Sequence, residues 1–112
     1  MSMIHVVTCC LSLLVVAVPA AVRDYQKAPG NPNRGKVVFE VCGVCHNADA
    51  NDKKAGPALK GLFKKVRMNN GKKPTEDKVR TLINEGGNGM PAYKDLLTEK
   101  EKRDLIAYLR TL

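Results

Sequence analysis

The sequence predicts an all-α fold of three to four short helices joined by long connections. Two observations support this class. Helix-capping residues precede the amphipathic stretches, and no segment alternates apolar and polar residues as a strand would. The connections contain many glycine, proline and asparagine residues. Because long loops are uncommon in so small a domain, we expect them to wrap around something.

The N-terminal stretch differs in composition from the rest of the chain. All 19 basic and all 11 acidic residues follow Val22. The preceding run "IHVVTCCLSLLVVAVPA" is largely apolar and ends in small residues, so residues 1–20 are expected to be a secretory signal peptide. An N-terminal membrane anchor is the alternative, because the run is barely long enough to span a bilayer. Cleavage would also remove Cys9 and Cys10, which leaves two cysteines in an exported, periplasmic protein.

The folded domain is expected to begin shortly after this segment. Residues 21–32 are interpreted as a linker and residues 33–112 as the domain. Asn31 followed by Pro32 is typical of a helix cap with proline in the first turn. This pattern predicts a first helix that runs to about Cys42 or beyond.

The middle of the chain is expected to be mostly loop, with one short turn near residues 59–63. Thr75 can cap the next helix, which the pair Gly86 and Gly87 would end. Its predicted apolar face consists of Val79, Leu82 and Ile83.

The last helix has the clearest start signal. Thr98 and Glu101 match a capping box, in which each residue satisfies a backbone N–H near the other. The apolar residues that follow recur at helical spacing and predict a buried face: Leu105, Tyr108, Leu109 and Leu112.

The stretch "VCGVCHNAD" carries the chemistry. On a helical turn, Cys42, Cys45 and His46 would share one face. A thioredoxin-like redox site would need a βαβ setting, a zinc site would need further ligands, and a structural disulfide would give His46 no role. The remaining hypothesis is covalent haem attachment, for which C-x-x-C-H is the signature.

A haem would also account for the composition. The chain has no Trp, two Phe and three Tyr, which is little aromatic mass for a core. Small domains often need a cofactor or a covalent staple to be stable. A porphyrin would supply the missing bulk, and the loops would wrap it.

With these motifs in view, the chain resembles the class I c-type cytochromes, specifically the small soluble monohaem cytochromes c of bacteria. The similarity runs from about Asn33 to Leu112. It rests on four motifs in the family's order: "GxxxFxxCxxCH" from Gly35 to His46, "GPALKGL" from Gly56 to Leu62, "GMPAY" from Gly89 to Tyr93, and "LIAYLRTL" from Leu105 to Leu112.

The resemblance implies a cytochrome c fold and roles for individual residues. Cys42 and Cys45 would carry one haem c through thioether bonds, and His46 would ligate the iron. The carbonyl of Pro57 would accept a hydrogen bond from the other ring nitrogen and so orient the ligand. Two further side chains would line the haem, those of Leu59 and Leu62.

The resemblance also implies that the first and last helices pack together. Gly35 and Phe39 would meet Leu105 and Tyr108. A glycine costs a helix interior about 1 kcal/mol, and a close backbone contact would explain its use there.

Two methionines downstream of the apolar run could supply the distal ligand. Met68 lies in "KKVRMNNGKK", among five basic residues and two asparagines, and is expected to be an exposed loop residue. Met90 lies between Gly89 and Pro91 after the third helix, so it is the expected ligand together with His46. Such ligation raises the reduction potential and leaves no open coordination position, which predicts an electron carrier rather than an enzyme.

One departure from the mitochondrial members concerns the haem propionates. A Gly-Arg pair that helps hold a propionate there is replaced here by Lys64 and Lys65, and no Trp is present. Arg67, Lys65 or Tyr93 could substitute.

The charge distribution suggests a partner. The segment from Lys53 to Arg80 holds ten basic residues against Glu76 and Asp77. It could be only a solvated face, but it could also dock a redox protein with an acidic surface, or contact anionic lipid. Nucleic-acid binding fits poorly with an exported protein that has few stacking aromatics.

We therefore expect a monomeric one-electron carrier in an exported respiratory or related chain. Two rival hypotheses remain open. A haem peroxidase would need an open iron position, and a gas-sensing module would need a distal methionine bond that yields to the gas.

Overall fold

The computed structural model consists of helices and long loops. It describes residues 15–17, 19 and 28–112. The expected signal peptide, with Cys9 and Cys10, falls almost wholly outside the described residues, as does most of the expected linker. Across the described ranges, no helix has the length and apolar character needed to cross a membrane.

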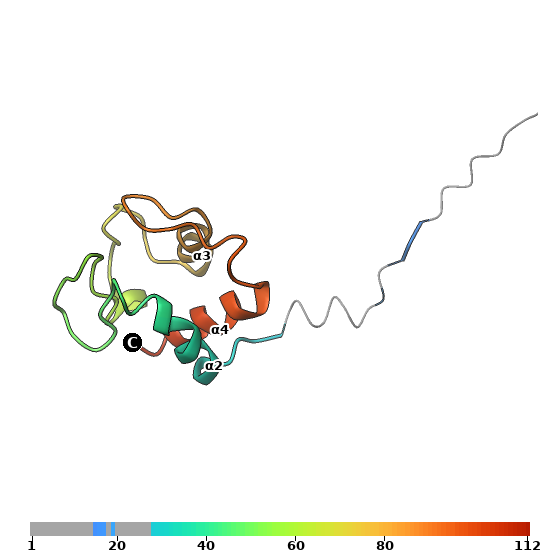
Figure 1. Cartoon of the computed structure of the whole chain (residues 1–112), viewed down its shortest axis with the longest axis horizontal. Coiled ribbons are helices and arrows are strands. Elements are labelled where there is room, and N and C mark those ends of the chain that lie inside the picture. The colour runs from blue at the N-terminus through green and yellow to red at the C-terminus, as the bar shows by residue number, and fades with distance from the viewer. Residues whose placement is uncertain (1–14, 18, 20–27) are drawn as a thin grey trace, which may run out of the picture.

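The described part contains helices and one isolated antiparallel bridge, between Gly87 and Met90, but no strand. In Figure 1, α2 and α4 lie close together, α3 lies to one side of them, and long loops form the rest of the domain. The predicted all-α class is confirmed. The elements in chain order are α2 (Pro32–Val38), the 3₁₀ helices η1 (Phe39–Val41) and η2 (Leu62–Lys64), α3 (Glu76–Glu85) and α4 (Glu99–Leu109).

Helix α2 begins as predicted but changes its winding earlier than expected. The side chain of Asn31 accepts hydrogen bonds from the N–H groups of Asn33 and Arg34. After Val38 the chain tightens into η1, and the carbonyl of Phe39 accepts from two successive N–H groups, each at 2.8 Å. A carbonyl oxygen has two lone pairs and can accept both bonds. The helical turn therefore reaches the cysteines, but not as a regular α-helix.

The other two helices have the predicted caps. The Thr75 hydroxyl accepts from the N–H of Lys78, and α3 ends at Glu85 with Gly86 as its C-cap. Thr98 and Glu101 form the reciprocal capping box of α4. Each helix start was predictable because a cap is a local contact between a side chain and a nearby backbone N–H.

The seam between α2 and α4 is the most extensive helix contact in the described part. Gly35 lies directly against the backbone of Asp104 and the Cβ of Tyr108, so no larger residue fits there. The rings of Phe39 and Tyr108 lie 5.3 Å apart, within the range of favourable aromatic pairs. The predicted pairing of the first and last helices is thus confirmed.

A buried carboxylate fixes the beginning of this seam. Asp104 is only 2% exposed. It accepts hydrogen bonds from the N–H of Asn31 at 2.7 Å, Nε of Arg34 at 3.0 Å and Nζ of Lys100 at 2.9 Å. Burial acts to raise the pKa of Asp104, but the three hydrogen bonds together hold that pKa well below its ordinary range. The sequence had no feature that indicated this cluster.

The core includes one residue that was predicted to be exposed. Met68 is 9% exposed and belongs to the main apolar cluster. Its N–H donates to the carbonyl of Lys72 at 2.8 Å, and the N–H of Gly71 donates to the Met68 carbonyl at 2.9 Å. This tight loop keeps the lysines outside and turns the thioether inward. The expectation of an exposed Met68 was wrong because neighbouring polar residues do not fix where one side chain points.

Candidate functional site

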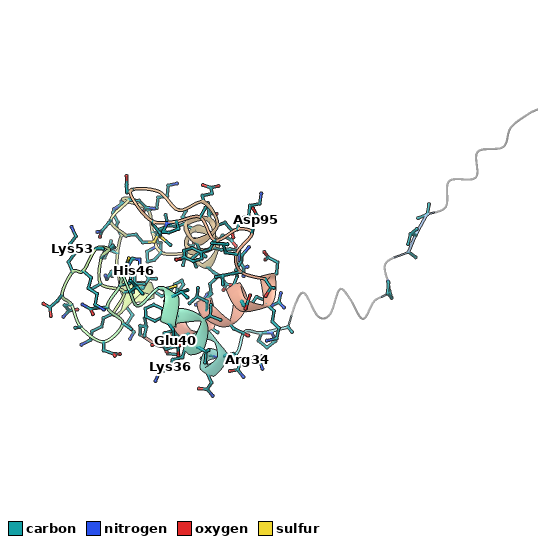
Figure 2. All side chains as sticks on the ribbon, in the orientation of Figure 1. Arg34, Lys36, Glu40, His46, Lys53 and Asp95 are labelled. Carbon is teal, nitrogen blue, oxygen red and sulfur yellow. The ribbon has the colours of Figure 1, made fainter. Side chains whose placement is uncertain are left out.

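A large cavity lies between the histidine segment, α3 and the loop that follows α3. Its volume is about 460 Å³, within the usual range of small-molecule and cofactor sites. In the view of Figure 2, the half-buried His46 lies within the outline of the domain, whereas Lys53 lies at its edge. Most of the wall is apolar, and its apolar residues include Leu59, Leu62, Val79, Leu82, Ile83 and Leu109.

His46 is held in one orientation. Its Nδ1 lies 2.7 Å from the carbonyl oxygen of Pro57. A carbonyl can only accept, so Nδ1 carries the proton and donates it, which leaves Nε2 with a free lone pair. The hydrogen bond expected between these two residues is therefore present. It fixes the tautomer that a metal-binding histidine needs.

Gly56 forms a cradle for the imidazole. A Cβ at this position would lie 2.5 Å from Cε1 and 2.8 Å from Nδ1 of His46. The N–H of Gly56 also donates to the carbonyl of Cys45 at 2.8 Å. The backbone thus packs closely against the ring, and the glycine is required by this close approach.

The two cysteines lie on the turn that precedes His46. Both are partly buried, and they do not form a disulfide with each other. The N–H groups of Cys45 and His46 donate to the carbonyl of Cys42 at 3.1 and 2.9 Å, so the three residues share one helical turn. Cys45 lines the cavity, whereas Cys42 packs against the edge of the core. Burial raises the pKa of the Cys42 thiol, and the neighbouring Cys45 raises it further.

Both candidate methionines line this cavity. Met90 sits at the end of a glycine-rich turn, where it exchanges backbone hydrogen bonds of 2.9 and 3.0 Å with Gly87. Residues 86 to 89 all have positive φ, and Asn88 is the one residue among them that is not glycine. The turn therefore requires these glycines. Met68 also reaches the cavity, from the buried side of its own loop, which the sequence did not indicate.

The polar part of the wall is basic. Lys53 and Lys65 line it together with asparagines. Nζ of Lys65 donates to the carbonyl of Ala58 at 2.8 Å, next to Pro57. Of the three residues considered as propionate partners, Lys65 lines the cavity, whereas Arg67 and Tyr93 are not among its lining residues.

These features fit a covalent haem. The cavity is apolar, its walls offer an imidazole with a free Nε2 and two thioethers, and two thiols stand beside the imidazole. A bare metal ion would need a cluster of His, Cys, Asp or Glu side chains. Within the described part of the chain, no group of three such residues gathers.

Comparison with known proteins decides the family. The family model described as cytochrome c oxidase, cbb3-type, subunit III matches residues 30–109. The chain belongs to the c-type cytochromes. A cytochrome c6-like protein of Nostoc sp. is 35% identical over 81 residues, which cover 70% of this chain and 68% of that protein. Cytochrome c6 of Thermosynechococcus vestitus is 30% identical over 106 residues, or 95% of this chain and 87% of its own.

The structural comparison agrees on the fold. The crystal structure of cytochrome c6 from the diatom Phaeodactylum tricornutum superposes with a TM-score of 0.59 at 22% identity, covering 73% of this chain and 93% of that one. The protein thus has the cytochrome c fold. Its cofactor is one covalent haem c, for which Cys42 and Cys45 fit the attachment motif, and it is a haem-based electron carrier, not an enzyme.

Proposed function

We propose that this cytochrome is an exported one-electron carrier whose single haem is attached through Cys42 and Cys45 and ligated by His46 and Met90. The observation that carries the proposal is the fixed imidazole of His46, whose proton is held on Nδ1 by Pro57 and whose Nε2 is free. When bound, the haem supplies an iron that gains and loses one electron.

The residues of the chain each contribute to this transfer. Pro57 holds the His46 ring in its orientation and, by accepting a hydrogen bond from Nδ1–H, makes Nε2 a stronger ligand. Apolar side chains such as Leu59 and Leu62 keep water from the site and lower its polarity. A methionine ligand raises the potential, and a filled coordination position keeps the site from reacting with small molecules.

Met90 is favoured over Met68 as the distal ligand. Met68 is packed in the core and helps to hold its own loop in place. Met90 instead ends a glycine-rich turn at the cavity and is only partly buried, so its thioether has fewer packing contacts to lose. Its position in "GMPAY" adds the support of the family motif.

Export is proposed from the apolar run in residues 1–20 and from the chemistry of the site. In bacteria this kind of haem attachment takes place outside the cytoplasm. A cleaved signal peptide would leave the protein free in the periplasm, and an uncleaved anchor would tether it to the membrane. We propose that the carrier works as a monomer.

The proposed partner is a redox protein with an acidic surface. Several amines of the basic segment, Lys53 to Arg80, bond only to main-chain carbonyls, which leaves their charge uncompensated, as with Lys54 to Gly43 at 2.9 Å and Lys65 to Ala58 at 2.8 Å. Arg80 is different, because it pairs with Glu76 and Glu99. The remaining positive potential would steer an acidic partner, and attraction to anionic lipid is the alternative.

The test has two parts. One sample is denatured in acid acetone to see whether the haem can be extracted, and a second, native sample is followed through a redox titration. Haem that stays on the polypeptide, together with a one-electron titration curve, is the expected result. Haem that extracts freely would contradict attachment through the cysteines. Two-electron behaviour or turnover of peroxide would contradict the role as a carrier.

A further inference from the structure

Lys102 is the feature of the molecule that electron transfer leaves unexplained. It lies in α4 and is only 2% exposed, one of the largest fully buried side chains in the described part of the chain. A lysine is rarely buried unless its charge is paired, because removing an ammonium from water is costly. Burial of this residue therefore requires an explanation from its contacts.

The ammonium of Lys102 has two partners. Nζ donates to Oε1 of Glu99 at 2.8 Å and to the main-chain carbonyl of Lys94 at 2.9 Å. Glu99 itself is largely exposed and is also bound by Arg80 of α3 at 3.2 Å. The hydrogen bond from Lys102 is the largest influence on the pKa of Glu99, and it holds that pKa below its ordinary value. The carboxylate thus stays charged and compensates the buried ammonium.

The carbonyl of Lys94 belongs to the connection that carries Met90. This connection runs between α3 and α4 and is drawn in orange in Figure 1. On the α3 side, the N–H groups of Tyr93 and Lys94 donate to the carbonyls of Ile83 and Asn84 at 2.9 and 3.2 Å. On the α4 side, Lys102 supplies a charged donor to the same stretch. The segment just after Met90 is therefore fastened from both helices.

The two fastenings differ in strength. The bonds to α3 join neutral backbone groups, whereas the bond from Lys102 has a charged donor and lies away from water, where such bonds are stronger. Loops open locally at a lower free energy than the whole domain, and each bond that must break on opening raises that free energy. Lys102 is thus placed to decide how often this loop opens.

We propose that Lys102 is a positioning residue for the distal ligand, because its buried ammonium fastens the Met90 loop to α4 and so limits how often Met90 leaves the cavity. The inference rests on the proposed ligation by Met90. Lys102 does not touch the ligand. Its effect would therefore be seen mainly in the rate at which the loop opens, and less in the haem absorption spectrum of the protein with the loop closed.

The test compares Lys102→Met with Lys100→Met in the haem-loaded full chain. Both variants remove one ammonium from α4, but Lys100 pairs with Asp104 at the seam with α2 and does not contact the loop. The measurement is the rate of cyanide binding to the ferric protein at saturating cyanide, where departure of the methionine is limiting. Thermal unfolding and the charge-transfer band of the His/Met haem are recorded alongside.

Lys102→Met is expected to bind cyanide about tenfold faster than wild type, which corresponds to about 1.4 kcal/mol for the loss of a charged hydrogen bond. Lys100→Met is expected to keep the wild-type rate even if it melts earlier. A Lys102→Met rate equal to wild type, or equal acceleration in both variants, would overturn the proposal.

A second variant covers the case in which Lys102→Met does not fold. Glu99→Gln is a surface change that weakens the pairing of the ammonium but leaves its bond to the Lys94 carbonyl, and we expect a smaller acceleration. No acceleration in Glu99→Gln would then count against the proposal. A wild-type protein that lacks the charge-transfer band would instead refute Met90 ligation itself, so the two failures are distinguishable.

Discussion

Substitution of Gly56 tests how tightly the backbone holds the proximal histidine. A Cβ at this position would lie 2.5 Å from Cε1 of His46 and 3.0 Å from Nε2. Carbon atoms prefer a separation of about 3.5–4.0 Å, so Gly56→Ala forces either the ring or residues 56 and 57 to move by about 1 Å. The bond from Nδ1 to the Pro57 carbonyl, now 2.7 Å, would lengthen.

Two effects follow from this displacement. Overpacking of a well-packed site costs about 1–3 kcal/mol. In a domain of this size each kcal/mol lowers the melting temperature by roughly 4–8 °C. A weaker hydrogen bond at Nδ1 also makes the imidazole a poorer donor to the iron, so the reduction potential should rise.

The assay is thermal unfolding together with a redox titration, with Gly43→Ala as the matched control. A Cβ at Gly43, between the two cysteines, would lie 3.5 Å or more from its nearest neighbours, which is ordinary contact. This variant should stay within about 1 kcal/mol of wild type. If Gly56→Ala melted and titrated like wild type, the backbone would not form the close cradle described here.

Two further predictions concern charge. Because hydrogen bonds depress the pKa of folded Asp104, its stabilising effect is present above the unfolded pKa of about 3.9 and is lost as the pH falls below it. Melting temperatures measured from pH 6 downward should therefore fall more steeply in wild type than in Asp104→Asn, and equal slopes would exclude this role. In the basic segment, Lys72 and Lys73 are exposed and absent from the cavity wall, unlike Lys65. Reversing both charges should slow electron exchange with an acidic partner and weaken the dependence of the rate on salt concentration. A wild-type rate that is independent of salt would contradict electrostatic docking, and the basic segment would then be only a solvated face.

The sequence predicted the helices because their signals are local. Asn31, Thr75 and the pair of Thr98 and Glu101 each cap a nearby backbone N–H, and each does so in the structure. The 3₁₀ winding of η1 was not predicted. This tighter turn next to the cysteines depends on backbone hydrogen bonds, and no residue type in the sequence indicates them.

The candidate site was predictable where spacing carries the chemistry. The motif at Cys42, Cys45 and His46 identified the haem hypothesis, and the cavity contains His46 and Met90 together. The buried position of Met68 was missed because composition averages over a loop, whereas burial depends on contacts made by distant segments.

Lys102 was missed although a signal existed. It stands three, four and seven residues before Leu105, Ile106 and Leu109, so helical spacing puts it on the buried face of α4. Lys102 lies in the charged run "EKEKRD", whose residues are mostly not buried, so composition suggested that it was exposed. Periodicity was therefore a better guide to burial than residue type at this position.

The ferric spectrum of Met90→Ala, measured beside Met68→Ala, tests the central claim most directly. If Met90 ligates the iron, its removal should abolish the charge-transfer band of the His/Met haem, lower the potential and let cyanide bind at once. Met68→Ala should keep the band and lose stability instead, by about 2–5 kcal/mol for a buried methionine. A band that survives in Met90→Ala and disappears in Met68→Ala would contradict the account. The distal ligand of the iron would then be Met68 of the core and not Met90 of the loop between α3 and α4.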